Sequence, residues 1–264
     1  MSYLETNGGR VHFQRLGAQG PLLVSVHGLI VDNLSSWYFS VGKGLSERAR
    51  LVMYDLRGHG KSQHPVAGYR TGDFVADLEG LIEAVGGGEP AHVIANSFGG
   101  VVGLNLALKR PDLVRSLILL EAHLGDIGFA EGMAATMDLP EAEVNRLVSE
   151  SFANWAGRHS DVRRNRLAET ARWLLHDTTI RADLLAGPEL SSAQLAELVV
   201  PLFCIYGEHS DLFDKSLLLC SLLPATKFAV LSGRSHSVLW DETQQIVELV
   251  HDWLDGFEPS SDNS

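Results

Sequence analysis

Residues 92–102 constrain the fold of this chain more than any other stretch of its sequence. The apolar residues 93–95 predict the end of a buried strand, and a helical spacing of apolar residues runs over 101–108. Between them lies a short turn, residues 96–100, with Ser97 at its centre. A strand, a sharp turn carrying a serine and then a helix make up the nucleophile-elbow layout, in which a strained backbone holds the hydroxyl clear of the sheet.

A simpler interpretation is that Ser97 is an ordinary turn residue. Ala95 stands where the usual G-x-S-x-G pattern has its first glycine. A free serine hydroxyl is also a weak nucleophile, so catalysis requires a base and an orienting acid elsewhere in the chain. The residues downstream therefore decide between the two interpretations.

Strands that alternate with helices on both sides of this turn predict a mainly parallel sheet covered on both faces. Asn7-Gly8 lies between two short alternating segments and predicts an N-terminal β-hairpin. Asp241 and Gln244 have capping-box spacing and predict the start of the last helix. Buried strands are expected at residues 21–26, 51–54, 93–95, 117–120, 201–206 and 227–231.

The pattern changes between Ala122 and Leu198, where helical periodicity dominates and no strong strand signal occurs. This stretch predicts a helical cap over the site, inserted into one α/β core. We therefore expect a core of residues 1–121 and 199–257, a cap of residues 122–198 and a polar, disordered tail of residues 258–264.

Charge and composition narrow the classes of function. The formal net charge of −12 over 264 residues disfavours binding to nucleic acid or to an acidic membrane. No apolar run approaches the roughly 18 residues of a membrane span, and the N-terminus lacks a signal-peptide pattern. Cys204 and Cys220 are expected to be small buried hydrophobes. These features predict a cytoplasmic protein that needs neither a metal nor a cofactor.

Three polar residues follow three predicted strands: Ser97, Asp211 and His236. The carboxyl ends of parallel strands line the ligand crevice of an open α/β sheet, so these side chains are expected to meet there. His236 would take the proton of Ser97, Asp211 would orient the imidazole, and Ser97 would form an acyl-enzyme. Glu121, at the end of the strand after the turn, is a second candidate for the acid.

An acyl-transfer site also needs amide donors aimed at the developing oxyanion. The backbone N–H of Phe98 begins the helix after Ser97, where amides lack intrahelical partners. The N–H of Leu29, in the loop that follows His27-Gly28, is the expected second donor.

Taken together, these motifs resemble the α/β-hydrolase fold superfamily. The resemblance covers nearly the whole chain outside the cap and implies a mostly parallel, eight-stranded sheet with helices on both faces. It rests on His27-Gly28, the box Asp55-x-Arg57-Gly58-x-Gly60-x-Ser62, the turn at 96–100, Gly207-Glu208-x-x-Asp211 and His236. In this superfamily the Asp55 box is a structural turn and not a catalytic element.

The turn at 96–100 and Trp240 are similar to meta-cleavage-product hydrolases, which break C–C bonds in ring-fission dienones. That family usually carries a loop rich in Ser, Gly and Pro after the His-Gly pair, whereas this chain has residues 29–34, Leu-Ile-Val-Asp-Asn-Leu. Biosynthetic esterases, thioesterases and lactonases of the same fold remain open.

The main hypothesis is a serine hydrolase acting on an ester or thioester of a small, largely apolar acyl substrate. The expected substrate pocket consists of His27, Gly28, Ile30, Trp37, Trp155, Trp173 and Trp240. C–C hydrolysis of a vinylogous keto acid is the alternative. It needs a cation for the substrate carboxylate, which an arginine of the cap (158, 163, 164, 166 or 172) could supply. A binding protein that kept the fold without catalysis is the third hypothesis.

Overall fold

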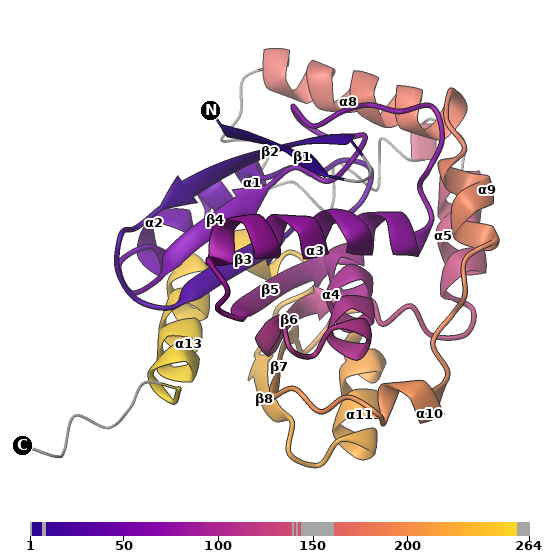
Figure 1. The fold of residues 1–264 in the computed structure, drawn as a ribbon. Coiled ribbons are helices and arrows are strands. Elements are labelled where there is room, and N and C mark those ends of the chain that lie inside the picture. Colours follow the sequence, from indigo (N-terminus) through magenta and orange to yellow (C-terminus); the bar gives the residue numbers. More distant parts are fainter. Residues whose placement is uncertain (1, 7–8, 139, 141, 144–160, 258–264) are drawn as a thin grey trace, which may run out of the picture.

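The protein is built on one eight-stranded sheet flanked by helices (Figure 1). The computed structural model describes residues 2–6, 9–138, 140, 142–143 and 161–257. The strands are β1 (Ser2–Thr6), β2 (Gly9–Leu16), β3 (Leu22–Val26), β4 (Arg50–Tyr54), β5 (Ala91–Ser97), β6 (Val114–Ala122), β7 (Leu202–Gly207) and β8 (Lys227–Leu231). They lie in the order β1-β2-β4-β3-β5-β6-β7-β8. The prediction of an eight-stranded α/β-hydrolase sheet is confirmed.

Most of the sheet is parallel. Only β1 with β2 and β2 with β4 pair antiparallel, and every other neighbouring pair runs in the same direction. Thr6 lies opposite Gly9, as in a two-residue hairpin, although Asn7 and Gly8 themselves lie outside the described residues. The carboxyl ends of β3, β5, β6, β7 and β8 therefore meet at one edge of the sheet.

The sheet separates two hydrophobic cores because successive side chains of a strand point to opposite faces. Leu51 and Met53 of β4 lie in one core, and Val52 and Tyr54 lie in the other. The first core is closed by α1 (Ser35–Phe39), α2 (Gly42–Leu45), α12 (Val238–Asp241) and α13 (Thr243–Asp255). The second is closed by α3 (Thr71–Gly86), α4 (Phe98–Lys109) and α11 (Phe213–Leu222).

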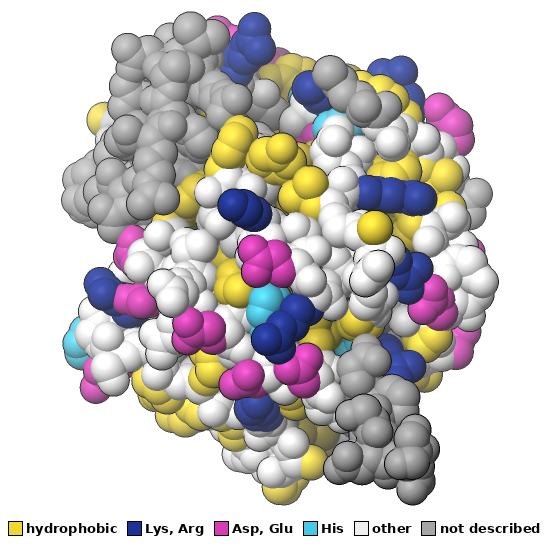
Figure 2. Space-filling model, turned by 90° about the vertical axis from the view of Figure 1, so that its left-hand side faces the viewer, with side chains coloured by type: hydrophobic (Ala, Val, Ile, Leu, Met, Phe, Trp, Pro, Cys, Tyr) yellow, Lys and Arg dark blue, Asp and Glu magenta, His cyan; other side chains and the backbone are white. Residues whose placement is uncertain are grey.

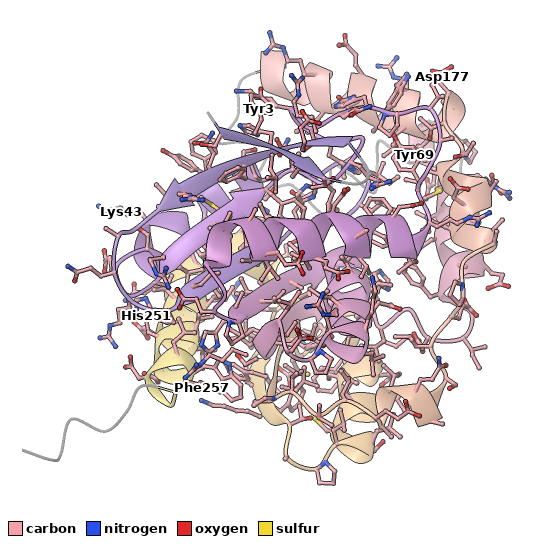
Figure 3. All side chains as sticks on the ribbon, viewed as in Figure 1. Tyr3, Lys43, Tyr69, Asp177, His251 and Phe257 are labelled. Carbon is pink, nitrogen blue, oxygen red and sulfur yellow. The ribbon has the colours of Figure 1, made fainter. Side chains whose placement is uncertain are left out.

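The C-terminal helix and the residues after it contact two other elements of the fold. His251 of α13 contacts the carbonyl oxygen of Gly44 at 3.1 Å, which joins α13 to α2. Phe257, labelled in Figure 3, lies beyond the helix. Its ring packs edge-on against His92 of β5, with centroids 4.9 Å apart. These two contacts hold the segment after β8 against the first core.

The last helix does not begin where the capping-box spacing predicts. Asp241 ends the short helix α12, and α13 starts at Thr243. Between them Glu242 adopts φ −124° and ψ 37°, which breaks the helix. Val238, Leu239 and Trp240 of α12 are all buried, so tertiary packing fixes a separate turn here and overrides the local capping signal.

Helices dominate the described part of residues 122–198, as expected. They are α5 (Phe129–Met137), α8 (Asp161–His176), α9 (Ile180–Leu185) and α10 (Ser192–Leu195). Within the described residues of this segment, the isolated bridge from Asp126 to Leu190 is the one β feature outside the sheet strands. Figure 1 shows α5 and α9 side by side at one flank of the molecule, with α8 above them.

The outer surface is mixed in charge. On the face shown in Figure 2, basic and acidic side chains are interspersed and form no extended basic patch among the side chains described there. Within the described residues, no helix has both the length and the apolar character that a membrane crossing requires.

Candidate active site

Ser97 occupies a strained turn between β5 and α4. Its backbone has φ 52° and ψ −122°, a conformation that L-residues rarely adopt. The turn is tight because β3 and α4 pass very close together. A methyl group on Gly99 would lie 2.5 Å from the carbonyl oxygen of Val26, so only glycine fits there. The nucleophile-elbow geometry expected from the sequence is present.

Ser97 and His236 line the same small cavity, of about 200 Å³, at the carboxyl edge of the sheet. Ser97 comes from the end of β5, and His236 comes from the loop between β8 and α12. Gly28, Leu29 and Asp32 enter the cavity from the loop after β3, and Trp240 enters from α12. The fold thus brings the serine and the imidazole together from positions far apart in sequence.

Two carboxylates face the Nδ1 atom of His236. Glu121 Oε2 lies 3.2 Å from Nδ1, within hydrogen-bond distance, whereas Asp211 Oδ1 lies 3.9 Å away. The Glu121 side chain is fully buried, while 82% of the Asp211 side chain is exposed. Both acids considered from the sequence therefore reach the histidine, and the second candidate makes the closer contact.

Glu121 is held in place from several sides. It is the last residue but one of β6, has a positive φ of 49°, and extends its side chain to Gly207 of β7. Its two carboxylate oxygens accept hydrogen bonds from the backbone N–H of Gly207 and the hydroxyl of Ser210. These hydrogen bonds compensate for the contacts with water that a buried carboxylate loses.

The environment of His236 favours its protonated form. Burial alone would lower the pKa of His236, but the hydrogen bond and charge of Glu121, aided by the charge of Asp211, outweigh burial and raise it above 6.5. An imidazole in this setting is a strong base, which suits removal of a proton from Ser97.

The loop after β3 is braced by two buried histidines. His27 Nε2 accepts the N–H of Leu56 at 2.9 Å, so its Nδ1–H donates to the carbonyl of Gly28. His59 Nε2 accepts the N–H of Ile30 at 3.0 Å. Burial lowers the pKa of His59 to about 3, which keeps this acceptor neutral.

These hydrogen bonds leave the backbone N–H of Leu29 available to donate to an oxyanion in the cavity. Leu29 lines the cavity, and no acceptor for its N–H occurs among the described residues. Phe98 begins α4 directly after Ser97. The first amides of a helix have no intrahelical acceptor, so both expected oxyanion donors lie in suitable segments.

The Asp55 box stabilises the loops next to the cavity through hydrogen bonds. Asp55 accepts the backbone N–H groups of Leu34 and Lys61, each at 2.9 Å, and contacts His12 at 2.7 Å. Burial alone would raise the pKa of Asp55, but the hydrogen bonds from His12, Lys61 and Leu34 lower it below its ordinary value. These contacts match the structural role that the resemblance implied for the box.

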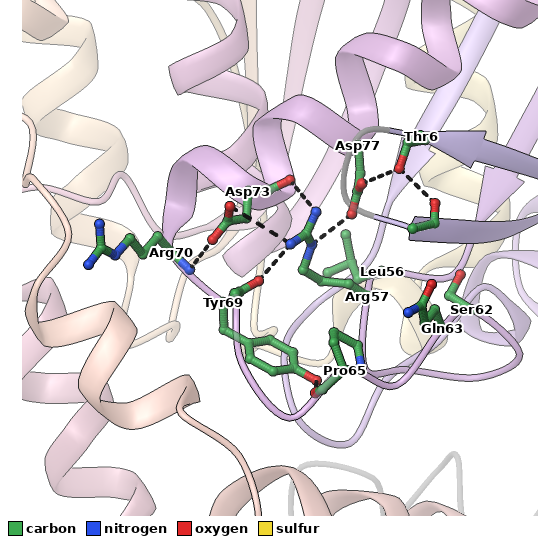
Figure 4. A network of polar contacts seen from close by, with 12 residues as sticks. Thr6, Leu56, Arg57, Ser62, Gln63, Pro65, Tyr69, Arg70, Asp73 and Asp77 are labelled. Carbon is green, nitrogen blue, oxygen red and sulfur yellow. Dashed lines mark hydrogen bonds and ion pairs between the residues drawn. The ribbon is translucent and has the colours of Figure 1, made fainter.

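Arg57 of the same box joins three segments (Figure 4). Its guanidinium pairs with Asp77 of α3 at 2.8 Å and donates to the carbonyl oxygens of Gly68 and Asp73. Asp77 in turn accepts a hydrogen bond from Thr6 of β1 at 2.6 Å. The network ties the loop after β4 to α3 and to the N-terminal hairpin.

Only part of the predicted substrate pocket is found at the cavity. Gly28 and Trp240 line it. His27 and Trp37 do not line this cavity and have no exposed surface: His27 accepts a hydrogen bond that braces the loop, and Trp37 belongs to the core on the α1 side of the sheet. Ile30 and Trp173 pack partly buried against the other core, and Trp155 lies outside the described residues.

A larger cavity, of about 500 Å³, lies elsewhere. It is bounded by β2, by α1 and by residues 166, 167 and 170 of α8, and it contains neither Ser97 nor His236. Volume therefore does not identify the reactive site, which is defined by the serine and histidine.

Asp32 is a charged residue of the cavity lining that the sequence interpretation did not identify. It is only 9% exposed and lines the cavity beside Ser97. One signal was available, because it is the sole charged residue in the unusual loop 29–34.

Comparison with known proteins decides the family. A family model described as the alpha/beta hydrolase fold matches residues 21–172, which is more than half of the chain and includes the Asp55 box and the elbow. The chain belongs to the α/β-hydrolase fold family.

Two curated relatives of this α/β-hydrolase are a hydrolase and an esterase. The 2-(acetamidomethylene)succinate hydrolase of Mesorhizobium japonicum is 34% identical over 39% of this chain, but the match spans only 36% of that enzyme. The pimeloyl-[acyl-carrier protein] methyl ester esterase of Aeromonas hydrophila is 28% identical over 92% of this chain and 99% of its own length.

Solved structures of the same fold include the meta-cleavage product hydrolase CumD of Pseudomonas fluorescens IP01. It superposes with a TM-score of 0.79 at 21% identity and covers 98% of each chain. At this identity the likeness establishes the fold of the present α/β-hydrolase and does not establish its substrate.

Proposed function

We propose that this α/β-hydrolase is a serine hydrolase that cleaves an ester or thioester of a small, largely apolar acyl substrate. The observation that carries the proposal is the convergence of three groups at one cavity. These are the Ser97 hydroxyl on its strained turn, the His236 imidazole in the same cavity, and a buried carboxylate on the far side of that imidazole.

In this mechanism the Nε2 atom of His236 removes the proton of Ser97 as its oxygen attacks the carbonyl carbon. Nδ1 keeps its proton, which is directed toward Glu121. The carboxylate thereby fixes the tautomer and stabilises the imidazolium that forms. His236 then protonates the leaving alcohol or thiol, and water repeats the sequence to release the acid from the acyl-enzyme.

The amides of Leu29 and Phe98 would bind the oxyanion of the tetrahedral intermediate. Removal of one such donor typically costs about 10²–10³-fold in rate in serine hydrolases. Leu29, Val31, Leu239 and Trp240 supply apolar surface to the cavity, and its modest volume suits a short acyl group. The esterase relative that matches nearly the whole chain supports ester chemistry.

Ser97→Ala tests the proposal with p-nitrophenyl acyl esters of increasing chain length. We expect turnover to fall by a factor on the order of 10⁴ or more, because the serine and histidine act as one unit. Unchanged circular dichroism would show that the fold survives the substitution. Full activity in the Ala variant would remove Ser97 from the mechanism.

C–C hydrolysis is the second candidate, favoured by the elbow sequence 96–100 and by Trp240. It requires a cation for the substrate carboxylate, yet no Lys or Arg among the described residues lines the cavity. Arg166 lines the other, larger cavity, and Arg172 is exposed; the side chains of the remaining candidate arginines are not described. Decay of the visible absorbance of a ring-fission dienone, dependent on Ser97, would favour this candidate over the ester.

A further inference from the structure

Asp32 places a carboxylate in the wall of the reactive cavity, close to the nucleophile. A methyl group built on Gly28 would lie 3.3 Å from Asp32 Oδ2 and 3.7 Å from Ser97 Oγ. The carboxylate oxygen and the serine hydroxyl therefore flank the same glycine, and both line the cavity.

The charge of Asp32 has no cationic partner within the described residues. Its three contacts are the backbone N–H groups of Gly28 and Asn33, at 2.9 and 2.8 Å, and the hydroxyl of Ser36. None of these donors carries a charge. The other ionisable group of the cavity lining is His236, which already faces Glu121 and Asp211.

The contacts of Asp32 are also unevenly divided between its two oxygens. Oδ1 accepts from Asn33 and Ser36, whereas Oδ2 accepts from Gly28 alone. A carboxylate oxygen can accept two hydrogen bonds, so Oδ2 retains an acceptor position. Oδ2 lies beside Gly28, the glycine that Ser97 also flanks.

We propose that Asp32 selects the substrate by charge, so that this hydrolase takes esters or thioesters carrying a cationic group, such as an ammonium, within reach of the reacting carbonyl. This inference rests on the proposed function, because it concerns the substrate of the same Ser97 site. A substrate anion at this position would meet Asp32 without any described cation to offset it, and like charges in a partly buried site repel strongly.

A purely structural role for Asp32 is the competing explanation, since its Gly28 contact also shapes the loop that presents the Leu29 amide. Loss of that role would slow all substrates alike. Loss of a selecting charge would change the rates of cationic and anionic substrates in opposite directions. The ratio of rates therefore separates the two explanations even in a damaged variant.

The test uses two ester series of matched shape. In the first series, the acyl chain of a p-nitrophenyl ester ends in a cationic trimethylammonio, a neutral tert-butyl or an anionic sulfonate group. In the second series, the same three groups end the alcohol portion of an acetate ester. For wild type we expect kcat/KM for the cation to exceed that for the anion by about a hundredfold in at least one series. Asp32→Asn should reduce that ratio by about tenfold or more, because the substitution removes one negative charge close to the substrate.

Asp214→Asn is the matched control, because Asp214 is exposed on α11 and its replacement changes the net charge equally. In Asp214→Asn, the ratio of kcat/KM for the cationic ester to that for the anionic ester should equal the wild-type ratio. A wild-type preference for neutral or anionic esters in both series, or a ratio unchanged by Asp32→Asn, would overturn the inference. Absence of Ser97-dependent hydrolysis of all six esters would instead contradict the proposed function, and the inference would fall with it.

Discussion

At the scale of single residues, the acid that orients His236 is the point on which sequence and structure diverge. Motif order favours Asp211, which follows β7, whereas the structure gives the hydrogen bond to Glu121 at the end of β6. The identity of this acid determines how strongly the imidazolium form of His236 is stabilised. A buried carboxylate interacts with an imidazolium through a lower effective dielectric than an exposed one does.

The two carboxylates should therefore differ in their effect on rate. Glu121→Gln keeps the shape of the side chain but removes its charge and should lower kcat by about 10²–10⁴-fold. Asp211→Asn should lower kcat less than about tenfold, because its exposed charge is screened by solvent. Steady-state kinetics on one ester checks both variants, and a larger loss from Asp211→Asn would reverse the assignment.

The pH dependence of the same variants provides an independent check. A general base must be neutral, so kcat/KM should rise with pH, with a midpoint above 6.5 because Glu121 and Asp211 raise the pKa of His236. Glu121→Gln removes the main source of this increase and should move the midpoint to lower pH. A wild-type midpoint below pH 6, or a profile that Glu121→Gln leaves in place, would contradict this account of His236.

Sequence was sufficient to propose Ser97 and His236, because each follows a strand whose apolar pattern is clear. It could not choose between Asp211 and Glu121, since that choice depends on the positive φ of Glu121 and on donors contributed by β7 and the turn after it. It also assigned Trp37 to the pocket because a large aromatic residue fits a core and a cavity equally well.

At the scale of the elements, the close approach of α4 to β3 determines where the nucleophile lies. Gly99 allows the helix to start against the Val26 carbonyl, and Gly100 lets it pass Ala122. The strain at Ser97 is maintained because packing on both sides leaves no alternative path for the chain. The periodicity of residues 101–108 predicted the helix, but only the structure shows how closely the helix approaches β3.

A methyl group at this contact should be costly. Gly99→Ala would push against backbone atoms of β3 and should reduce the free energy of unfolding by about 2–4 kcal/mol, with a loss of ester turnover. Gly72→Ala, in the first turn of α3 where an added Cβ meets nothing within 4 Å, is the matched control. The control should be neutral or stabilise by up to about 1 kcal/mol. Urea unfolding measures both, and equal stability of the two variants would show that the α4–β3 contact is looser than described.

At the scale of the whole molecule, burial keeps several histidines neutral in the folded protein. Burial lowers the pKa of His59 to about 3 and that of His92 to about 4. In the unfolded chain both titrate near 6.5. The stability that they contribute is therefore fully present above pH 6.5 and is lost as the pH falls toward their folded-state pKa values.

Each of these groups changes the free energy of unfolding by about 1.4 kcal/mol per pH unit below 6.5. His59 and His92 alone should reduce it by roughly 4 kcal/mol between pH 7.5 and 5.0, a window in which most carboxylates remain ionised. His123, whose pKa burial lowers to about 4, adds to this loss. His236, whose pKa is raised, acts in the opposite direction and offsets part of this loss. Urea titrations at a series of pH values check the slope, and a constant free energy across the window would mean that these histidines are not buried in the neutral form.

Site-directed chemistry tests the central claim of this account most directly. A fluorophosphonate reacts with a serine only when a nearby base and oxyanion donors activate it. We expect intact-mass and peptide analysis to find one adduct, on Ser97, and to find none in His236→Ala under the same conditions. A protein that remains unmodified, or one labelled at a different serine, would contradict the proposal that Ser97 and His236 form a reactive pair.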